Sequence, residues 1–201
     1  MSRFAILALS GAVGLGGCTT PSLHPLVSEN TEIAVPALVG VWSGEDEGEV
    51  IEISALQPGP GYGLVTQPPG DDEQPVALEV RAVSIGEHRF LDVTHIGDPV
   101  LMPLVFPAHV FIKFQVDDTT LTVWQMTDDW HKIEHLARQA KVERVRNRNG
   151  LRDFTIMTAS TAELQRFVAT HADDARVFSA KSDVYTRQPH GEAANPDPGK
   201  P

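Results

Sequence analysis

Short segments in which polar and apolar residues alternate, separated by turn-forming residues, recur along the middle of this 201-residue chain. Residues 49–53 (EVIEI) alternate with the period of two that a half-buried strand requires, and residues 110–116 (VFIKFQV) are the strongest strand signal. Gly86 and the Asp117-Asp118 pair mark short turns between such segments. Because consecutive strands joined by short turns run antiparallel, the sequence predicts an antiparallel meander.

The predicted strands cover most of the chain between residues 38 and 157. They are residues 38–42, 49–53, 62–66, 76–83, 88–93, 110–116, 121–124 and 151–157. One helix is predicted near 128–139, after the Thr127 hydroxyl and two acids, and another near 160–171, where residues 160–163 (STAE) form a capping box. The predicted fold class is therefore mainly β with two or three short helices. The strands are expected to form an antiparallel meander that is shaped as a barrel or a half-barrel.

The first eighteen residues have the three regions of a bacterial secretion signal. Arg3 supplies a positive charge, residues 4–15 are charge-free and mostly apolar, and Leu15-Gly16-Gly17-Cys18 follows. These last four residues resemble the lipobox of bacterial lipoproteins, which implies that residues 1–17 are removed and that Cys18 becomes a lipidated N-terminus. Several acyl chains, at about 0.8 kcal/mol per buried CH₂, would anchor it stably. The alternative is an ordinary secretory signal with a chance cysteine near its cleavage site.

The lipobox resemblance also implies a location in the bacterial cell envelope. The residue after the cysteine is Thr19 rather than Asp, which favours the outer membrane if the cell is Gram-negative. Cys18 is the only cysteine, so no internal disulfide is possible. The formal net charge of −11 argues against a nucleic acid as partner and against electrostatic adhesion to anionic lipid, so membrane attachment would have to be covalent or hydrophobic.

The mature chain is predicted to have three parts. Residues 18–36 contain three prolines among Ser, Thr and His, and we expect them to form a flexible tether. Residues 37–185 are expected to form one β-rich domain with its own core. Residues 186–201 hold four prolines and little that could be buried, which is typical of a disordered tail.

Two resemblances extend into this predicted domain. Gly40-Val41-Trp42 resembles the Gly-x-Trp signature of lipocalins and other calycins, which implies a Trp packed across the closed end of an up-and-down barrel. Blocks between about residues 38 and 178 resemble a family of uncharacterised bacterial lipoproteins, and this implies a compact β domain on a lipid anchor without naming an activity. The blocks are residues 38–42, 88–92, 107–111, 129–130 and 158–165.

No coherent set of catalytic residues can be identified. Residues 131–135 (HKIEH) match the zinc-binding pattern of inverzincin metallopeptidases, with His131 and His135 on one helix face and Glu134 as the base, but we expect a solvent-facing helix and no metal site. His88 and Asp92 lie on one face of a predicted strand, where they could form a polar pair, and His109 is expected to be a core or capping residue. No phosphate loop or dinucleotide fingerprint occurs, so no cofactor is expected.

The most unusual segment is residues 96–107, which is apolar yet contains three prolines and therefore cannot be a central strand. It could fold over the barrel as a lid, line the entrance of an apolar cavity or dock a protein. In the cavity case we expect Trp42, Leu101, Met102 and Phe106 to line it. The leading hypothesis is a non-enzymatic, lipid-anchored domain that binds an apolar small molecule or a partner protein of the envelope. The alternatives are a structural or assembly accessory without a cavity and, third, a metal-dependent hydrolase.

Overall fold

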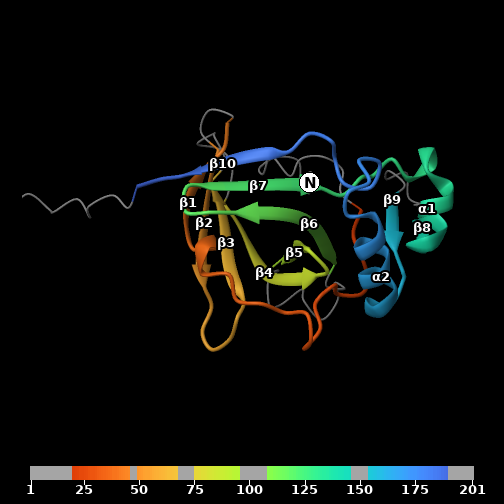
Figure 1. The fold of residues 1–201 in the computed structure, drawn as a ribbon, viewed down its shortest axis with the longest axis horizontal. Helices are drawn as coiled ribbons and strands as arrows, with labels where there is room; N and C mark the ends of the chain where they lie inside the picture. The colour runs from red at the N-terminus through yellow and green to blue at the C-terminus, as the bar shows by residue number, and fades with distance from the viewer. Residues whose placement is uncertain (1–19, 46–48, 68–74, 96–107, 146–153, 190–201) are drawn as a thin grey trace, which may run out of the picture.

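The central feature of the computed structural model is a closed barrel of eight antiparallel strands (Figure 1). The structure describes residues 20–45, 49–67, 75–95, 108–145 and 154–189. The barrel strands are β1 (Gly40–Ser43), β2 (Val50–Ala55), β3 (Tyr62–Gln67), β4 (Val76–Ile85), β5 (His88–His95), β6 (His109–Val116), β7 (Thr120–Gln125) and β10 (Asp183–Arg187). The predicted fold class is confirmed, and the meander closes into a full, lipocalin-like barrel because β10 pairs with both β1 and β7.

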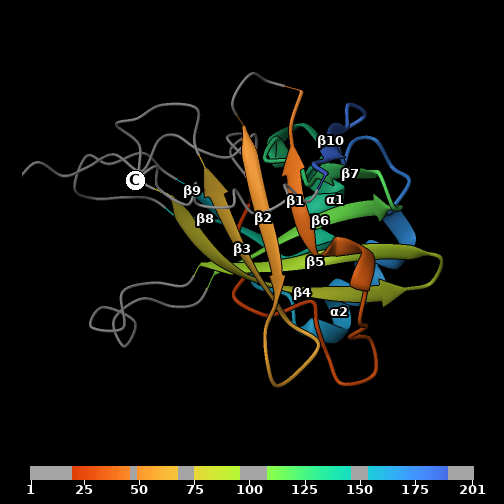
Figure 2. The same cartoon turned by 90° about the vertical axis from the view of Figure 1, so that its left-hand side faces the viewer.

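The remaining elements gather at one end of the barrel (Figures 1 and 2). They are the 3-10 turn η3 (Trp130–Lys132), the helices α1 (Glu134–Gln139) and α2 (Thr161–His171), and the hairpin of β8 (Val142–Val145) and β9 (Phe154–Met157). A further 3-10 turn, η1 (Pro36–Leu38), precedes β1. The domain therefore has two layers, a barrel and a cap of helices with a small hairpin.

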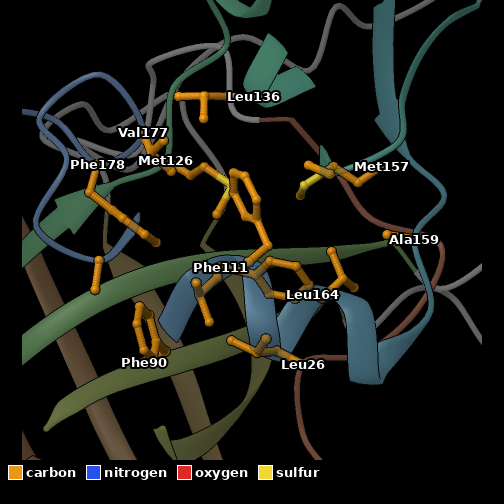
Figure 3. Packing of buried hydrophobic residues seen from close by; sticks show 14 of the residues in the cluster. Leu26, Phe90, Phe111, Met126, Leu136, Met157, Ala159, Leu164, Val177 and Phe178 are labelled. Atoms are coloured by element: carbon orange, nitrogen blue, oxygen red, sulfur yellow. The ribbon is translucent and has the colours of Figure 1, made fainter. Parts of the chain in front are cut away.

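Each layer has its own apolar core. Alternate residues of all eight barrel strands point inward and form the first core, in which Trp42, Tyr62, Phe114 and Tyr185 supply the large rings. An eight-stranded barrel is just wide enough for such side chains to fill. The second core lies between the outer face of the sheet and the helical layer, with Phe111 among Met126, Met157 and Leu164 (Figure 3).

Arg187 joins the two ends of the barrel sequence. Its guanidinium lies 4.2 Å from the centroid of the Trp42 ring and donates hydrogen bonds to the carbonyls of Ala37 and Val39. Trp42 is fully buried, and its Nε1 donates to the carbonyl of Leu38 at 2.9 Å. The last strand is thereby fastened to the 3-10 turn that precedes the first strand.

Gly40 is required by this closure. Its φ of +152° is one that side-chain-bearing residues rarely adopt, and a Cβ there would collide with the Arg187 guanidinium. The glycine therefore allows the close approach of Arg187 to the first strand.

The expectation of a flexible tether over residues 18–36 is wrong for residues 20–36. Thr20, Ser22 and Leu26 are all buried. Ser22 exchanges two backbone hydrogen bonds with His109 of β6, and the backbone N–H groups of Leu26 and Val27 both donate to the Asp92 carboxylate. A proline removes only its own N–H donor, so the residues between the prolines can still pair with the barrel.

Two other predicted boundaries differ from those of the structure. The helix expected near 128–139 is split into η3 and α1 because Ile133, at φ −135° and ψ 47°, is not helical. Thr186 and Arg187, which we had assigned to the tail, belong to β10. Of the strand expected at 151–157, residues 154–157 form β9, and residues 151–153 lie outside the described ones. The helix predicted near 160–171 is confirmed as α2, with the predicted capping box.

The ionisation of Glu163 in the capping box makes the stability of the protein depend on pH in the acid range. Hydrogen bonds from Lys141 and from Ser160 lower the pKa of Glu163 from 4.5 to about 2. A depressed carboxyl pKa contributes stability that is present above pH 4.5 and is lost as the pH falls through about 2. Glu163→Gln can still cap the helix but lacks the charge, so we expect a lower urea midpoint than wild type at neutral pH and a gap that closes toward pH 2. A gap independent of pH would contradict this.

Candidate functional site

A pocket of about 330 Å³ lies where β5 and β6 part. The ladder between these strands ends at the pair Arg89–Phe114, whereas β6 continues to Val116, which pairs with β7. The polar and aromatic side chains that line the pocket come from the β4–β5 turn, from β5 to β7 and from the end of α2. They include Glu87, His88, Arg89, Lys113, Gln115, Trp124 and Asp173.

Lys113 is the most enclosed cation of the pocket. It stands opposite Phe90 on the outer face of the barrel, where its side chain is only 16% exposed. The Nζ donates to the carbonyl of Ala172 at 2.8 Å, at the negative end of the α2 dipole, and lies 4.9 Å from the centroid of the Trp124 ring. These contacts hold the ammonium in place although it is largely removed from water.

Asp173 links two of the basic groups. One carboxylate oxygen lies 3.4 Å from Nε2 of His88 and the other 3.7 Å from Nζ of Lys113. Arg89, by contrast, is exposed at the rim and forms no ion pair with another described residue. The pocket thus holds one cation that is already paired with Asp173, a second cation, Arg89, whose charge is available to a ligand, and the exposed carboxylate of Glu87.

The sequence did not identify these residues as a site. Lys113 and Gln115 take outward-facing positions in the strand signal of residues 110–116, and Lys113 is the only charged residue in it, which was the available clue. Asp173 and Trp124 are brought to it by tertiary packing, which local patterns do not encode.

The predicted pairing of His88 with Asp92 is wrong. Residues four apart in a strand are separated by about 13 Å along it, too far for a hydrogen bond. Asp92, which is 3% exposed, instead accepts a 2.7 Å hydrogen bond from Nδ1 of His109. The hydroxyl of Ser22 donates to the carbonyl of His24, so it does not complete a catalytic triad with this pair. The pair fastens the N-terminal segment to the barrel.

The HKIEH pattern does not form the geometry that a metallopeptidase needs. His131 lies in η3, whereas Glu134 and His135 lie beyond the break at Ile133, so the two histidines do not share one continuous helix. All three side chains are solvent-exposed. Within the described ranges, no three His, Cys, Asp or Glu side chains are grouped so that they could hold a metal ion.

The other residues singled out in the sequence lie outside the described ones, with one exception. Leu15, Gly16, Gly17 and Cys18, and also Leu101, Met102 and Phe106, are not described. The lipid anchor and the apolar cavity wall therefore stay predictions. Trp42 is described, and its side chain belongs to the barrel core.

The class that the fold defines is a lipocalin-like, eight-stranded antiparallel barrel with a helical cap. Comparisons of the chain with protein-family models, curated proteins and solved structures gave no match. In the described part of the chain, no helix has the length and apolarity needed to cross a bilayer.

Proposed function

We propose that this chain is a lipid-anchored protein of the bacterial envelope that binds a small polar ligand, bearing an acidic group, without transforming it chemically. The observation that carries the binding proposal is the pocket between β5 and β6, whose volume falls in the range of about 300–1,000 Å³ of small-molecule sites. The anchor is supported by the Leu15-Gly16-Gly17-Cys18 sequence.

The polar lining and the exposed Arg89 guanidinium favour a ligand with an acidic group over the apolar ligand that the sequence suggested. A carboxylate or phosphate placed at the rim would accept charge-assisted hydrogen bonds from the planar Arg89 guanidinium. The Trp124 ring, which is half-buried, offers an apolar surface for the body of the ligand.

The binding proposal predicts a charge-specific loss of affinity. Calorimetric titration of the purified protein with citrate and with inorganic phosphate should show binding of at least one of them. Arg89→Glu should weaken it by about tenfold to a hundredfold, the equivalent of one charge-assisted hydrogen bond at about 1.5–3 kcal/mol. Arg138→Glu makes the same charge change on exposed α1 and should leave the affinity unchanged.

Two outcomes of this titration would contradict the proposal. One is equal weakening by Arg89→Glu and by Arg138→Glu, which would show only a response to net charge. The other is the absence of any binding, which would favour a structural or assembly accessory of the envelope.

A further inference from the structure

The β8–β9 hairpin has one face directed into the fold and one directed away from it. Met157 is buried in the outer core, so the face it shares with Thr155 points inward. The pair Val145–Phe154, together with Ile156, therefore lies on the opposite face. Phe154 is 47% exposed, the most exposed large apolar side chain in the described part of the chain. The outward face of the hairpin thus carries three apolar side chains together with the exposed Glu143, which pairs with Ile156, and it is in contact with solvent.

The N-terminal segment enters the fold at this hairpin. The Thr20 hydroxyl accepts a hydrogen bond from Nε1 of Trp130 at 2.8 Å and lies 3.2 Å from the hydroxyl of Thr155 on β9. The backbone N–H of Met157 donates to the carbonyl of Pro21 at 2.8 Å. Thr20 itself is only 2% exposed, so the chain is fixed from this residue onward.

The proposed anchor must consequently lie beside the hairpin. Cys18 precedes Thr20 by two residues, and an extended chain covers at most about 3.6 Å per residue, so the two α-carbons are within about 7 Å of each other. With residues 20–36 packed on the barrel, no long spacer separates acyl chains on Cys18 from the folded domain. A domain held so closely can present only the surface around Thr20 to the lipid.

We infer that the outward face of the β8–β9 hairpin rests on the bilayer and that Phe154 inserts at the interface. This inference rests on the proposed lipid anchor. The occupant is a phospholipid surface because the only covalent membrane attachment proposed for the chain begins at the same hairpin. Aromatic rings suit this depth of a membrane.

With the hairpin on the bilayer, the pocket between β5 and β6 lies on the aqueous side of the interface. His109, which pairs with Ser22 beside the hairpin, begins β6, and Gln115 of the pocket is six residues further along the strand. At about 3.3 Å per residue, this distance is about 20 Å. A ligand could thus reach the pocket without crossing the membrane interface.

The test uses the full-length, acylated protein in vesicles of phosphatidylethanolamine and phosphatidylglycerol. Phe154→Cys is labelled with an environment-sensitive fluorophore, since acylation occupies the thiol of Cys18. Leu56→Cys is the matched control, because Leu56 is 39% exposed and directly follows β2. Figure 1 shows the connection between β2 and β3 on the other side of the barrel from β8 and β9. Both positions are on the surface, where substitutions change stability by about 0.5 kcal/mol or less.

With vesicles, the emission of the fluorophore at position 154 is expected to shift to the blue, and aqueous iodide should quench it several-fold less than without vesicles. Neither the emission nor the quenching should change at position 56. Vesicle-bound, acylated protein in which both positions are quenched equally would overturn the inference while leaving the anchor intact. Protein without acyl mass that does not bind vesicles would overturn the anchor and this inference with it. Ligand binding in the pocket is measured separately and is unaffected by either outcome.

Discussion

Replacing Trp42 by Ala is expected to lower the free energy of unfolding by about 3–5 kcal/mol, the cost of removing a large buried aromatic. Trp42 is fully buried, its Nε1 donates to the carbonyl of Leu38, and its ring lies under the Arg187 guanidinium. The variant therefore loses core packing and both of these contacts at the closure of the barrel. Domains of this kind are stable by only about 5–15 kcal/mol, which leaves the variant marginal or unfolded. Urea unfolding followed by circular dichroism measures the loss.

Gly40→Val tests the contact between β1 and Arg187 at the barrel closure without removing any side chain from the core. A β-branched residue normally favours a strand, yet here it meets both an unfavourable φ and the Arg187 guanidinium. We therefore expect a destabilised protein. Val65→Ala, at a site 37% exposed on β3, is the control and should change stability by about 0.5 kcal/mol or less. A Gly40→Val protein as stable as wild type would contradict the role assigned to Arg187.

Asp92→Asn is expected to cost about 3–5 kcal/mol and to release residues 20–36 from the barrel. The carboxylate is buried and accepts hydrogen bonds from two backbone N–H groups and from His109, and an amide cannot accept all three in the same geometry. Breaking a buried ionic hydrogen-bond network by changing one member typically costs this much. The decrease in urea midpoint and the new proteolytic sensitivity of residues 20–36 measure the two effects.

The matched control for Asp92 lies on the neighbouring strand. Glu79 is half-buried and pairs with the exposed Arg81 at the surface, so Glu79→Gln should change stability by at most about 1 kcal/mol. If Asp92→Asn unfolds at the wild-type urea concentration, or if residues 20–36 stay protected, Asp92 does not hold the N-terminal segment.

The barrel strands could be predicted because the patterns that define them lie within a few neighbouring residues. The alternation of residues 49–53 and 110–116 sets the face of each strand, and short turns dictate antiparallel pairing. The capping box of α2 is likewise read within four residues. What could not be predicted depends on partners far apart in sequence. Arg187 reaches Val39 across 148 residues, and Leu26 reaches Asp92 across 66.

The candidate site was missed for the same reason. Lys113 was visible in the sequence as a charge in an apolar strand, but its significance depends on Ala172 and Asp173, which follow α2 about sixty residues later. The proline-rich composition of residues 18–36 indicated flexibility, because composition does not show that Asp92 and β6 supply the missing hydrogen-bond partners.

Native mass spectrometry of the protein extracted from the envelope of its own host tests the central proposal most directly. The predicted wild-type mass is that of residues 18–201 plus acyl chains and one retained small ligand. Cys18→Ala should lack the acyl mass, and Arg89→Glu should lack the ligand while keeping the acyl mass. A wild-type protein with neither acyl chains nor a retained ligand would contradict the account of a lipid-anchored binding protein.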